Sequence, residues 1–262
     1  MQDIMKNMRL VGFLKILANL KVITGLHIGS GSSGITIGEV DNPVIKINGK
    51  PYIPGSSLKG KLRSLLEHSE KLEIDNKEGL HICNNENCDL CAVFGRPAEK
   101  KGKEGPTRII FRDSYLNEEK SEKEARENGF LEIKWENRIH RLTGKVEVSL
   151  RDIERVLPGT VFDLEIIYRI YESDLDGKNI EEVKEIDNLP NKLKNRFGLI
   201  IKGLKLLEMD YLGGCGTRGY GKVKIENIVV ELHTIDAIKK NKPVVLKNGS
   251  LSDLYESLQA RI

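Results

Sequence analysis

The chain has 262 residues, of which 39% are apolar and 31% are charged, and its formal net charge is +3. This length suits one large domain or one domain with sizeable insertions, and the apolar content is sufficient for a hydrophobic core. Because the net charge is small, any nucleic-acid-binding surface must depend on where the cations gather.

The first apolar run, LVGFLKILANLKVI, is interrupted by Lys15, Asn19 and Lys21. These polar residues are incompatible with the core of a signal peptide and with a membrane span. Four cysteines, three of them clustered, do not form the pattern of a secreted disulfide framework. The sequence therefore predicts a soluble, cytoplasmic protein with no membrane partner.

The first half of the chain begins with an alternating pattern that predicts a long strand over residues 8–28. A Gly/Ser-rich loop with an Asp-Asn-Pro turn signal follows. Leucines then recur at helical spacing, at Leu58, Leu62, Leu65 and Leu66. They predict an amphipathic helix over residues 56–72, with Ser56 or Ser57 as its cap.

The second half begins with a Cys-rich segment, 81–95, and a polar stretch, 96–129. Strand-like runs follow at residues 107–113, 130–135, 145–150 and 160–171. A second helix is predicted over 191–209, and then come a glycine-dense loop and a closing strand over 222–232. This order predicts an α+β protein with a modified ferredoxin-like or RRM-like β-α-β-β-α-β core that carries large insertions.

The first helix contains the spacing of a phosphate-binding P-loop, with Gly55, Gly60 and Lys61 in place. Leu62 stands where a Ser or Thr should hold Mg²⁺, and no buried strand precedes the motif, so a nucleotide triphosphatase is not favoured. On the helix surface Lys59 and Arg63 form one cationic edge, whereas Lys61 falls on the other flank. The helix start with these cations suits a phosphate chain, and the alternative is a solvated helix edge.

A second segment that suits phosphate binding is the loop GGCGTRGYGK near the end of the chain. Its glycines surround Thr217 and Arg218, and glycine lets a backbone approach another chain closely while the Arg supplies charge. The alternative is an ordinary flexible hairpin tip.

The Cys-rich segment places His81, Cys83, Cys88 and Cys91 in the pattern H-x-C-x₄-C-x₂-C. One imidazole and three thiolates make a closed tetrahedral set, which is typical of structural zinc and leaves no open position for catalysis. A redox pair or free thiols on a loop are the alternatives.

No catalytic triad, paired-carboxylate motif or HExxH motif is present in the sequence. Asp41 is the candidate acidic residue, although by itself it is typical of an Asx-turn ahead of Pro43. Glu39 is a neighbouring carboxylate that can assist in metal binding.

Several motifs occur in one order: TGLHIG, DNPVIK, IPGSSLKGKLRSLLE, FGRP, GPTRIIFRD, KWENRIHRLTGKVEV and LEMDYLGGCGTRGYGKV. Together, over about residues 8–230, they closely resemble the RNA-binding backbone subunit of type III-A CRISPR effector complexes, in the repeat-associated mysterious protein (RAMP) superfamily. The resemblance implies one domain over 1–262, with a zinc segment (81–95) and an insertion (96–150). It also implies a β-hairpin thumb, placed within 113–150. The charged stretch 117–128 has the composition of a disordered segment, which leaves the thumb tip unplaced.

The resemblance also implies a guide RNA held by the first helix and by the glycine loop. The RNA contacts expected on this basis are His27, Ser57, Lys59, Lys61, Arg63, Gly214, Gly216 and Arg218. An aromatic content of 5% argues against base stacking and favours contact with the RNA backbone. The expected partners are guide RNA, single-stranded target RNA, other type III-A effector subunits and further copies of this chain along the RNA.

The resemblance assigns to Asp41 the cleavage of target RNA with Mg²⁺ or another divalent ion, and some relatives carry zinc at the Cys-rich segment. Two other functions stay open. One is an architectural guide-binding subunit without catalysis, and the other is a guide-processing endoribonuclease of the same superfamily.

Overall fold

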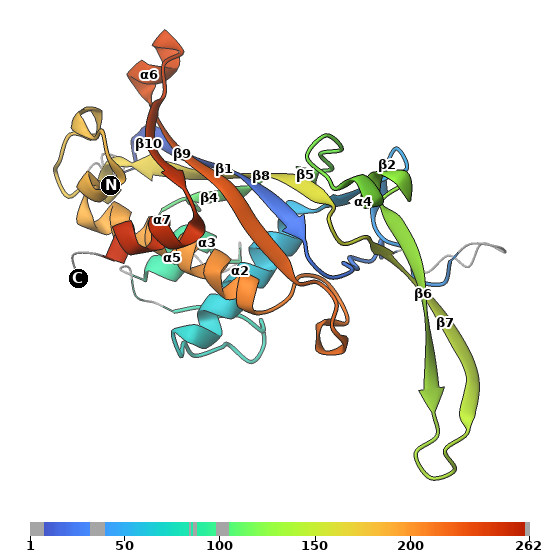
Figure 1. Ribbon diagram of the computed structural model, residues 1–262. Helices are drawn as coiled ribbons and strands as arrows, with labels where there is room; N and C mark the ends of the chain where they lie inside the picture. The colour runs from blue at the N-terminus through green and yellow to red at the C-terminus, as the bar shows by residue number, and fades with distance from the viewer. Residues whose placement is uncertain (1–7, 32–39, 84, 86–87, 98–104, 260–262) are drawn as a thin grey trace.

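A five-stranded antiparallel sheet is the centre of the fold, in a computed structural model that describes residues 8–31, 40–83, 85, 88–97 and 105–259 (Figure 1). Its strand order is β10-β9-β1-β8-β4. These strands are Leu10–Val22 (β1), Ile109–Phe111 (β4), Val161–Tyr171 (β8), Val223–Thr234 (β9) and Val244–Gly249 (β10). Apolar residues alternate along them, so that Leu14 and Ile16 of β1 are buried between their more exposed neighbours.

Helices cover one face of this sheet (Figure 1). They are α2 (Gly55–Ser69), α3 (Asp89–Phe94), α5 (Asn191–Met209) and α7 (Leu251–Gln259). The helices α2 and α5 pack closely, because a Cβ on Gly203 would lie 3.2 Å from Cγ of Leu62. Along the chain, β1-α2-β4-β8-α5-β9 is the predicted β-α-β-β-α-β order, with the strand arrangement of a ferredoxin-like fold. The predicted fold class is confirmed.

The last part of the chain adds elements that the sequence analysis did not predict. After β9 come α6 (Ile235–Lys240), the edge strand β10 and α7. Leu251, Leu254 and Leu258 of α7 are buried, so this extension contributes to the core. Strand β10 has only six residues and is partly exposed, which makes its pattern too weak to recognise.

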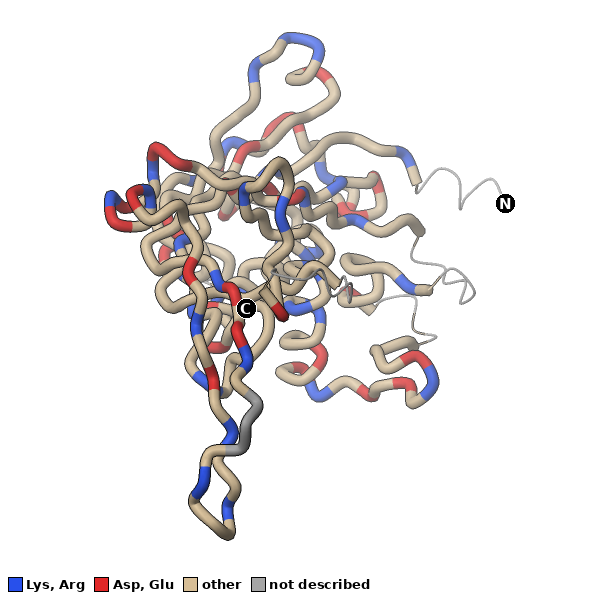
Figure 2. Tube along the Cα trace, turned by 90° about the vertical axis from the view of Figure 1, so that its right-hand side faces the viewer, with Lys and Arg blue, Asp and Glu red and all other residues tan. Residues whose placement is uncertain are grey.

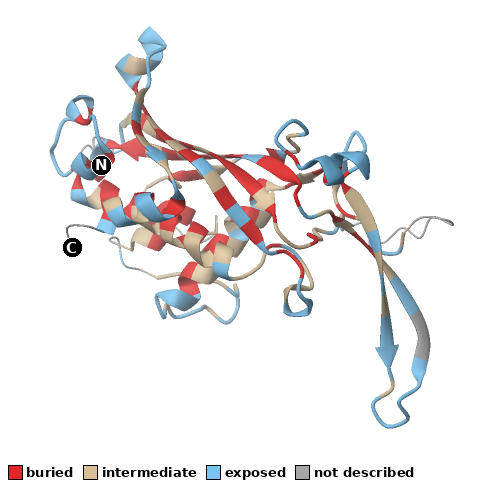
Figure 3. Cartoon of the chain, viewed as in Figure 1, coloured by how far each residue is buried: buried red, intermediate tan, exposed pale blue. Residues whose placement is uncertain are grey.

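A long hairpin projects from one end of the sheet (Figure 1). Its strands β6 (Leu131–Ile139) and β7 (Val146–Val156) pair antiparallel, with an irregularity between Glu136 and Arg138. Figure 3 shows that the outer part of the hairpin is mostly exposed, whereas the buried residues gather in the sheet and the helices. Strand β7 continues beyond residue 150, the limit given to the predicted thumb.

The charged stretch 117–128 lies at the base of this hairpin and is folded. It contains α4 (Lys123–Glu127), where Ala125 is buried, and the Oγ of Ser121 accepts a hydrogen bond from the N–H of Val161 at 3.0 Å. Nearby, a small sheet joins β2 (Lys46–Ile47), β3 (Lys50–Ile53) and β5 (Ser114–Tyr115). The interpretation of this stretch as disordered is wrong, because a few buried side chains hold it despite its charge.

The predicted cap of the first helix is also wrong. The cap residue is Pro54, and the N–H of Gly55 donates to the carboxylate of Asp113 at 2.8 Å. A Cβ on Gly55 would lie 2.4 Å from the carbonyl oxygen of Phe111, so the helix starts against the edge of the sheet, before Ser56 and Ser57. A side chain from a distant segment thus replaces the local serine cap.

A buried ion cluster joins α5 to the segments around it. The carboxylate of Asp174, which is fully buried, accepts hydrogen bonds from Nη1 of Arg196 at 2.5 Å and from the N–H of Tyr171 at 3.1 Å. Arg196 is 2% exposed, and its Nε donates to Asp89 of α3 at 2.8 Å. One guanidinium therefore links α5, α3 and the turn after β8.

We expect Arg196→Met to lower the free energy of unfolding by about 3 kcal/mol or more, because it leaves the buried Asp174 without its closest cationic partner. Urea denaturation of the full chain measures this. The matched control is Lys239→Met, which removes an exposed pair with Asp236 and should change stability by less than about 0.5 kcal/mol. Equal effects of the two variants would contradict the role given to the cluster.

Candidate functional site

Glu154 fastens the loop that follows residue 40 to the hairpin. Its carboxylate accepts hydrogen bonds from the N–H of Val44 at 2.9 Å and from Nζ of Lys46 at 2.7 Å. Its own N–H donates to the carbonyl of Asn42 at 3.0 Å. Glu154 is 7% exposed, so its bond from the N–H of Val44 is shielded from water and correspondingly strong, whereas Lys46 keeps contact with solvent. The loop is therefore fixed along β7, far from it in sequence.

Asp41 lies next to a second carboxylate in this arrangement. Its N–H donates to Oδ1 of Asp152 at 2.9 Å, and the Nδ2 of Asn42 donates to the carbonyl of Asp152 at 3.3 Å. Asp152, by a side-chain hydrogen bond and by its like charge, raises the pKa of the exposed Asp41 above its usual value. Two carboxylates at the base of the hairpin offer the hard oxygens that divalent cations prefer.

Neither Asp152 nor Glu154 was predicted from the sequence. Both lie on β7, and their relation to Asp41 depends on how the hairpin returns to the domain, which no local pattern in the sequence reports. Glu39, the other carboxylate named from the sequence, lies outside the described residues.

His27 joins this arrangement to the glycine loop. Its Nδ1 lies 2.7 Å from the carbonyl of Glu154, and its own carbonyl accepts a hydrogen bond from the N–H of Gly214 at 2.8 Å. A Cβ on Gly213 would lie 2.2 Å from the same carbonyl, so a glycine is required for this approach. The structure thus brings together three predicted site residues, Asp41, His27 and Gly214, through β7.

The glycine loop also packs against the hairpin. The hydroxyl of Tyr220 donates to Oε1 of Glu136 at 2.7 Å, and Nε of Arg218 lies 3.4 Å from Oε2 of the same residue. Burial and this hydrogen bond raise the pKa of Tyr220 to about 12. Arg218 keeps 59% of its side chain exposed, so it remains accessible at the surface of this contact.

Lys61 connects α2 to the start of the glycine loop. Its Nζ lies 2.7 Å from Oδ2 of Asp210 and 3.8 Å from the centre of the Tyr211 ring. A Cβ on Gly216 would lie 2.0 Å from that ring, so Gly216 packs directly on Tyr211. The helix and the glycine loop, named separately in the sequence, are thus in contact.

The opposite flank of α2 carries the two other predicted cations. Lys59 is half-buried and has no acidic partner among the described residues, and its pKa is lowered by burial and then by Arg63 and Arg169. Arg63 instead donates inside the chain, to Glu67 at 2.8 Å and to the carbonyls of Gly95 at 3.0 Å and His81 at 2.8 Å. Arg169 of β8, which was not predicted from the sequence, also lies near Lys59. Lys59, Arg63 and Arg169 thus form a cluster with excess positive charge.

Three of the predicted RNA contacts on this helix therefore have different surroundings. Lys59 has an ammonium that pairs with no acid in the described part of the chain, and its charge suits an anionic ligand. Arg63 has its donors engaged within the chain, which favours a structural role, and Ser57 is partly buried in the first turn of α2. Their assignment as RNA contacts stays a prediction.

The Cys-rich segment forms the side-chain cluster that the spacing predicts. One ligand atom from each of His81, Cys83, Cys88 and Cys91 lies within 4.8 Å of the others. Sγ of Cys83 is 3.9 Å from Sγ of Cys91, and Sγ of Cys88 is 3.6 Å from Nε2 of His81. These separations match the edges of a tetrahedron around a zinc ion with bonds of about 2.0–2.3 Å. The cluster can therefore hold a metal ion such as zinc.

Hydrogen bonds around the cluster orient its side chains for binding a metal ion. Nδ1 of His81 lies 2.7 Å from the carbonyl of Glu73, which leaves Nε2 as the ligand atom. The N–H of His81 donates to Glu67 at 2.9 Å, and Glu67 also accepts from Arg63. Hydrogen bonds from Cys91 lower the pKa of Cys88, which favours the thiolate form that binds a metal ion. The helix α2 thus holds the Cys-rich segment in place.

Among the residues that the structure describes, no helix combines the length and the apolarity needed to cross a membrane. Residues 19–224 match the RAMP superfamily. The "CRISPR system Cms endoribonuclease Csm3" of Methanocaldococcus jannaschii is 40% identical over 229 residues, which cover 86% of this chain and 83% of that protein. The protein of the same name from Streptococcus thermophilus is 38% identical over 217 residues, which cover 82% and 88%.

A solved structure is also similar to this chain. It is described as the crystal structure of the Csm3-Csm4 subcomplex in the type III-A CRISPR-Cas interference complex. The matched chain is 28% identical with a TM-score of 0.58, and the match covers 97% of this chain and 98% of that one.

Proposed function

Because the chain belongs to the RAMP superfamily and, within it, to the family of Csm3 endoribonucleases of CRISPR systems, we propose that it binds a CRISPR guide RNA as a repeated backbone subunit of a type III-A effector complex. In that complex it cleaves complementary target RNA at regular intervals. The observation that carries this proposal is the exposed carboxylate of Asp41, fixed beside Asp152 at the base of the projecting hairpin.

The hairpin is suited to nucleic acid. Residues 137–146 around its tip contain Arg138, Arg141 and Lys145 and no acidic residue, and Figure 2 shows this basic end of the hairpin. Closer to the base, Trp135 and Leu150 are 57% and 53% exposed. Cations attract phosphates, and exposed apolar side chains suit contact with bases. If copies of the chain repeat along a guide RNA, such a hairpin recurs once per copy, which supports cleavage at regular intervals.

The guide-binding surface that we propose extends from α2 to the glycine loop. Lys59 and Arg169 supply positive charge that the described acids do not balance, and Arg218 supplies an exposed guanidinium. The close approaches at Gly214 and Gly216 hold the loop against His27 and Tyr211. Contacts of this kind track the RNA backbone and leave sequence reading to base pairing.

For cleavage, we assign Asp41 one of two roles. It accepts the proton of the attacking 2′-hydroxyl while the 5′-oxygen of the next nucleotide leaves phosphorus, or it would be a ligand of a divalent ion that stabilises the charge on the phosphate. The carboxylates of Asp41 and Asp152 fit Mg²⁺ or a similar ion, which when bound supplies charge stabilisation of the transition state. Asp152 positions the backbone of Asp41 through the hydrogen bond from its N–H.

The partners that we propose follow from this function. They are guide RNA, single-stranded target RNA, other type III-A subunits and further copies of this chain. The solved relative in a Csm3-Csm4 subcomplex supports contact with other subunits. Copies along RNA require head-to-tail surfaces, because a filament of identical subunits forms only through heterologous contacts.

We further propose that the metal in the His/Cys cluster is zinc and that its role is structural. Three thiolates and one imidazole favour zinc over the harder ions, and four protein ligands leave no open position for a substrate. The cluster lies between α2 and α3, where it fixes the segment that carries Asp89, the partner of Arg196.

Two alternatives compete with this function. In the architectural one the chain binds guide RNA but does not cut, and Asp41 is only a turn residue. In the other the chain processes precursor guide RNA. The names of the relatives favour an endoribonuclease, and cleavage assays on precursor RNA and on guide-complementary RNA distinguish the two substrates.

For the metal site we expect purified protein to contain about one zinc per chain, because the ligand set is complete. Cys88→Ser and His81→Ala should lower the zinc content and the thermal stability together. Cys215→Ser is the matched control, since Cys215 lies outside the cluster. Elemental analysis measures the content, and less than about 0.2 zinc per wild-type chain under non-chelating conditions would contradict the proposal.

Separate substitutions of the two cations on α2 should give different phenotypes. Lys59→Ala should weaken binding of single-stranded RNA of any sequence and reduce its salt slope by about 1. Arg63→Ala should lower stability and zinc content, because Arg63 holds the carbonyls of His81 and Gly95. Filter binding at several salt concentrations, with zinc analysis, measures both. If Lys59→Ala leaves the slope unchanged, α2 does not contact phosphate through this residue.

In an assembled complex, Asp41→Ala and Asp41→Asn should both slow the cutting of complementary RNA by roughly 100-fold or more, the scale of a lost acid/base or electrostatic contact. Guide and target affinity should stay nearly unchanged, because binding depends on cations elsewhere. Asp152→Asn, which keeps an acceptor for the N–H of Asp41, should reduce cutting less than Asp152→Ala. Normal cutting by the Asp41 variants would favour the architectural alternative.

A further inference from the structure

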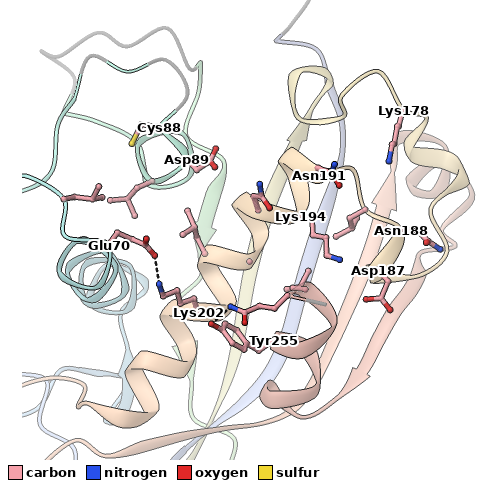
Figure 4. Close-up of a pocket in the computed structure, with 18 residues that line it drawn as sticks. Glu70, Cys88, Asp89, Lys178, Asp187, Asn188, Asn191, Lys194, Lys202 and Tyr255 are labelled. Atoms are coloured by element: carbon pink, nitrogen blue, oxygen red, sulfur yellow. Dashed lines mark hydrogen bonds and ion pairs between the residues drawn. The ribbon is translucent and has the colours of Figure 1, made fainter. Parts of the chain in front are cut away.

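A cavity of about 780 Å³ lies between α5, α7 and the start of α3 (Figure 4). This volume is in the range of small-molecule sites. Figure 1 places α7 and the start of α5 at the opposite end of the sheet from the hairpin, so the cavity is remote from the base of the hairpin, where the proposed cleavage site lies. Part of its wall is apolar, with Leu199, Leu258 and Tyr255 among the lining residues.

Lys194 is the unusual member of this lining. It is only 8% exposed, and no hydrogen bond or ion pair of its Nζ is formed within the described part of the chain. In Figure 4 its side chain extends from α5 toward the loop of Asp187 and Asn188. The stem of Lys194 is therefore buried while its ammonium faces the cavity without a protein partner, where it can pair with an anionic group.

The other charges around the cavity do not supply this anion. The lining has three carboxylates and three amines: Glu70, Asp89, Asp187, Lys178, Lys194 and Lys202. Glu70 accepts from Lys202 at 2.6 Å, and Asp89 accepts from Arg196 at 2.8 Å. The other three charged residues of the lining are Lys178, Lys194 and Asp187, and none of them has an ion-pair partner in the described residues. They comprise two positive charges and one negative charge. The unpaired charge of the lining is therefore positive.

We propose that this cavity binds a small phosphate ester of nucleotide size. Two amines suit a phosphate monoester, which carries nearly two negative charges at neutral pH. Its apolar or aromatic body would lie against Leu258 and Tyr255, while Asp187 accepts hydrogen bonds from hydroxyl or amino groups. The backbone N–H groups in the first turn of α5 contribute less to phosphate binding than the two amines do, because the N–H of Lys192 already donates to Asp176.

Titration calorimetry of the full chain with adenosine 5′-monophosphate, adenosine and inorganic phosphate tests this proposal. The monophosphate should bind saturably, and adenosine should bind at least about 10-fold more weakly because it lacks the anion. Lys194→Met should weaken monophosphate binding by about 10-fold or more. The matched control is Lys184→Met, an exposed lysine outside the cavity, which should bind like wild type. Hydrogen exchange in α5 and α7 should slow when the monophosphate is present.

Two results would overturn the proposal. One is the absence of saturable binding of either the monophosphate or phosphate up to about 5 mM. The other is equal binding by wild type and Lys194→Met, which would place the ligand elsewhere, for example on the cations of α2. Thermal unfolding gives an independent check. Lys194→Met should not lower the Tm, because it removes an ammonium that has no partner in the described part of the chain, whereas a clear decrease in Tm would show that the ammonium has a structural partner.

Discussion

The buried carboxylate of Glu154 is the contact on which the arrangement of the proposed cleavage site depends. It holds Val44 and Lys46 from one side, while the backbone of the same residue contacts Asn42 and His27. A hairpin of two strands is marginal by itself, so its position must come from contacts at its base. Through Glu154 the hairpin and the loop of Asp41 become one unit, and any shift of the hairpin on RNA carries the carboxylate with it.

The helix α2 organises the other side of the molecule in a comparable way. Leu58 and Leu62 bury one face in the core, Arg63 and Glu67 hold the Cys-rich segment, and Lys59 has no acidic partner among the described residues. Packing, metal binding and the proposed RNA contact thus share fifteen residues. A substitution on this helix will affect more than one property, which is why stability and metal content must be measured beside RNA binding.

The sequence was informative wherever a pattern is local. The alternation along β1, the leucine spacing of α2 and the bounds of α5 were predicted closely, although β1 ends at Val22 and not at residue 28. The four residues of the His/Cys cluster follow from spacing alone. Prediction failed where a distant segment decides the outcome. Asp113 caps α2 in place of a serine, and the engagement of Arg63 with His81 is invisible on a helical wheel. Asp152 and Glu154 were missed for the same reason, because only the folded hairpin brings them to residues 41–46.

The central claim is that Glu154 positions Asp41 for cutting, and the single-turnover rate of target-RNA cleavage by complexes assembled with Glu154→Ala tests it most directly. The account predicts a rate about 10-fold or more below wild type, with unchanged guide affinity and zinc content, and substantial recovery in Glu154→Gln, which retains an acceptor for the N–H of Val44. A normal cleavage rate in correctly assembled Glu154→Ala complexes would contradict it.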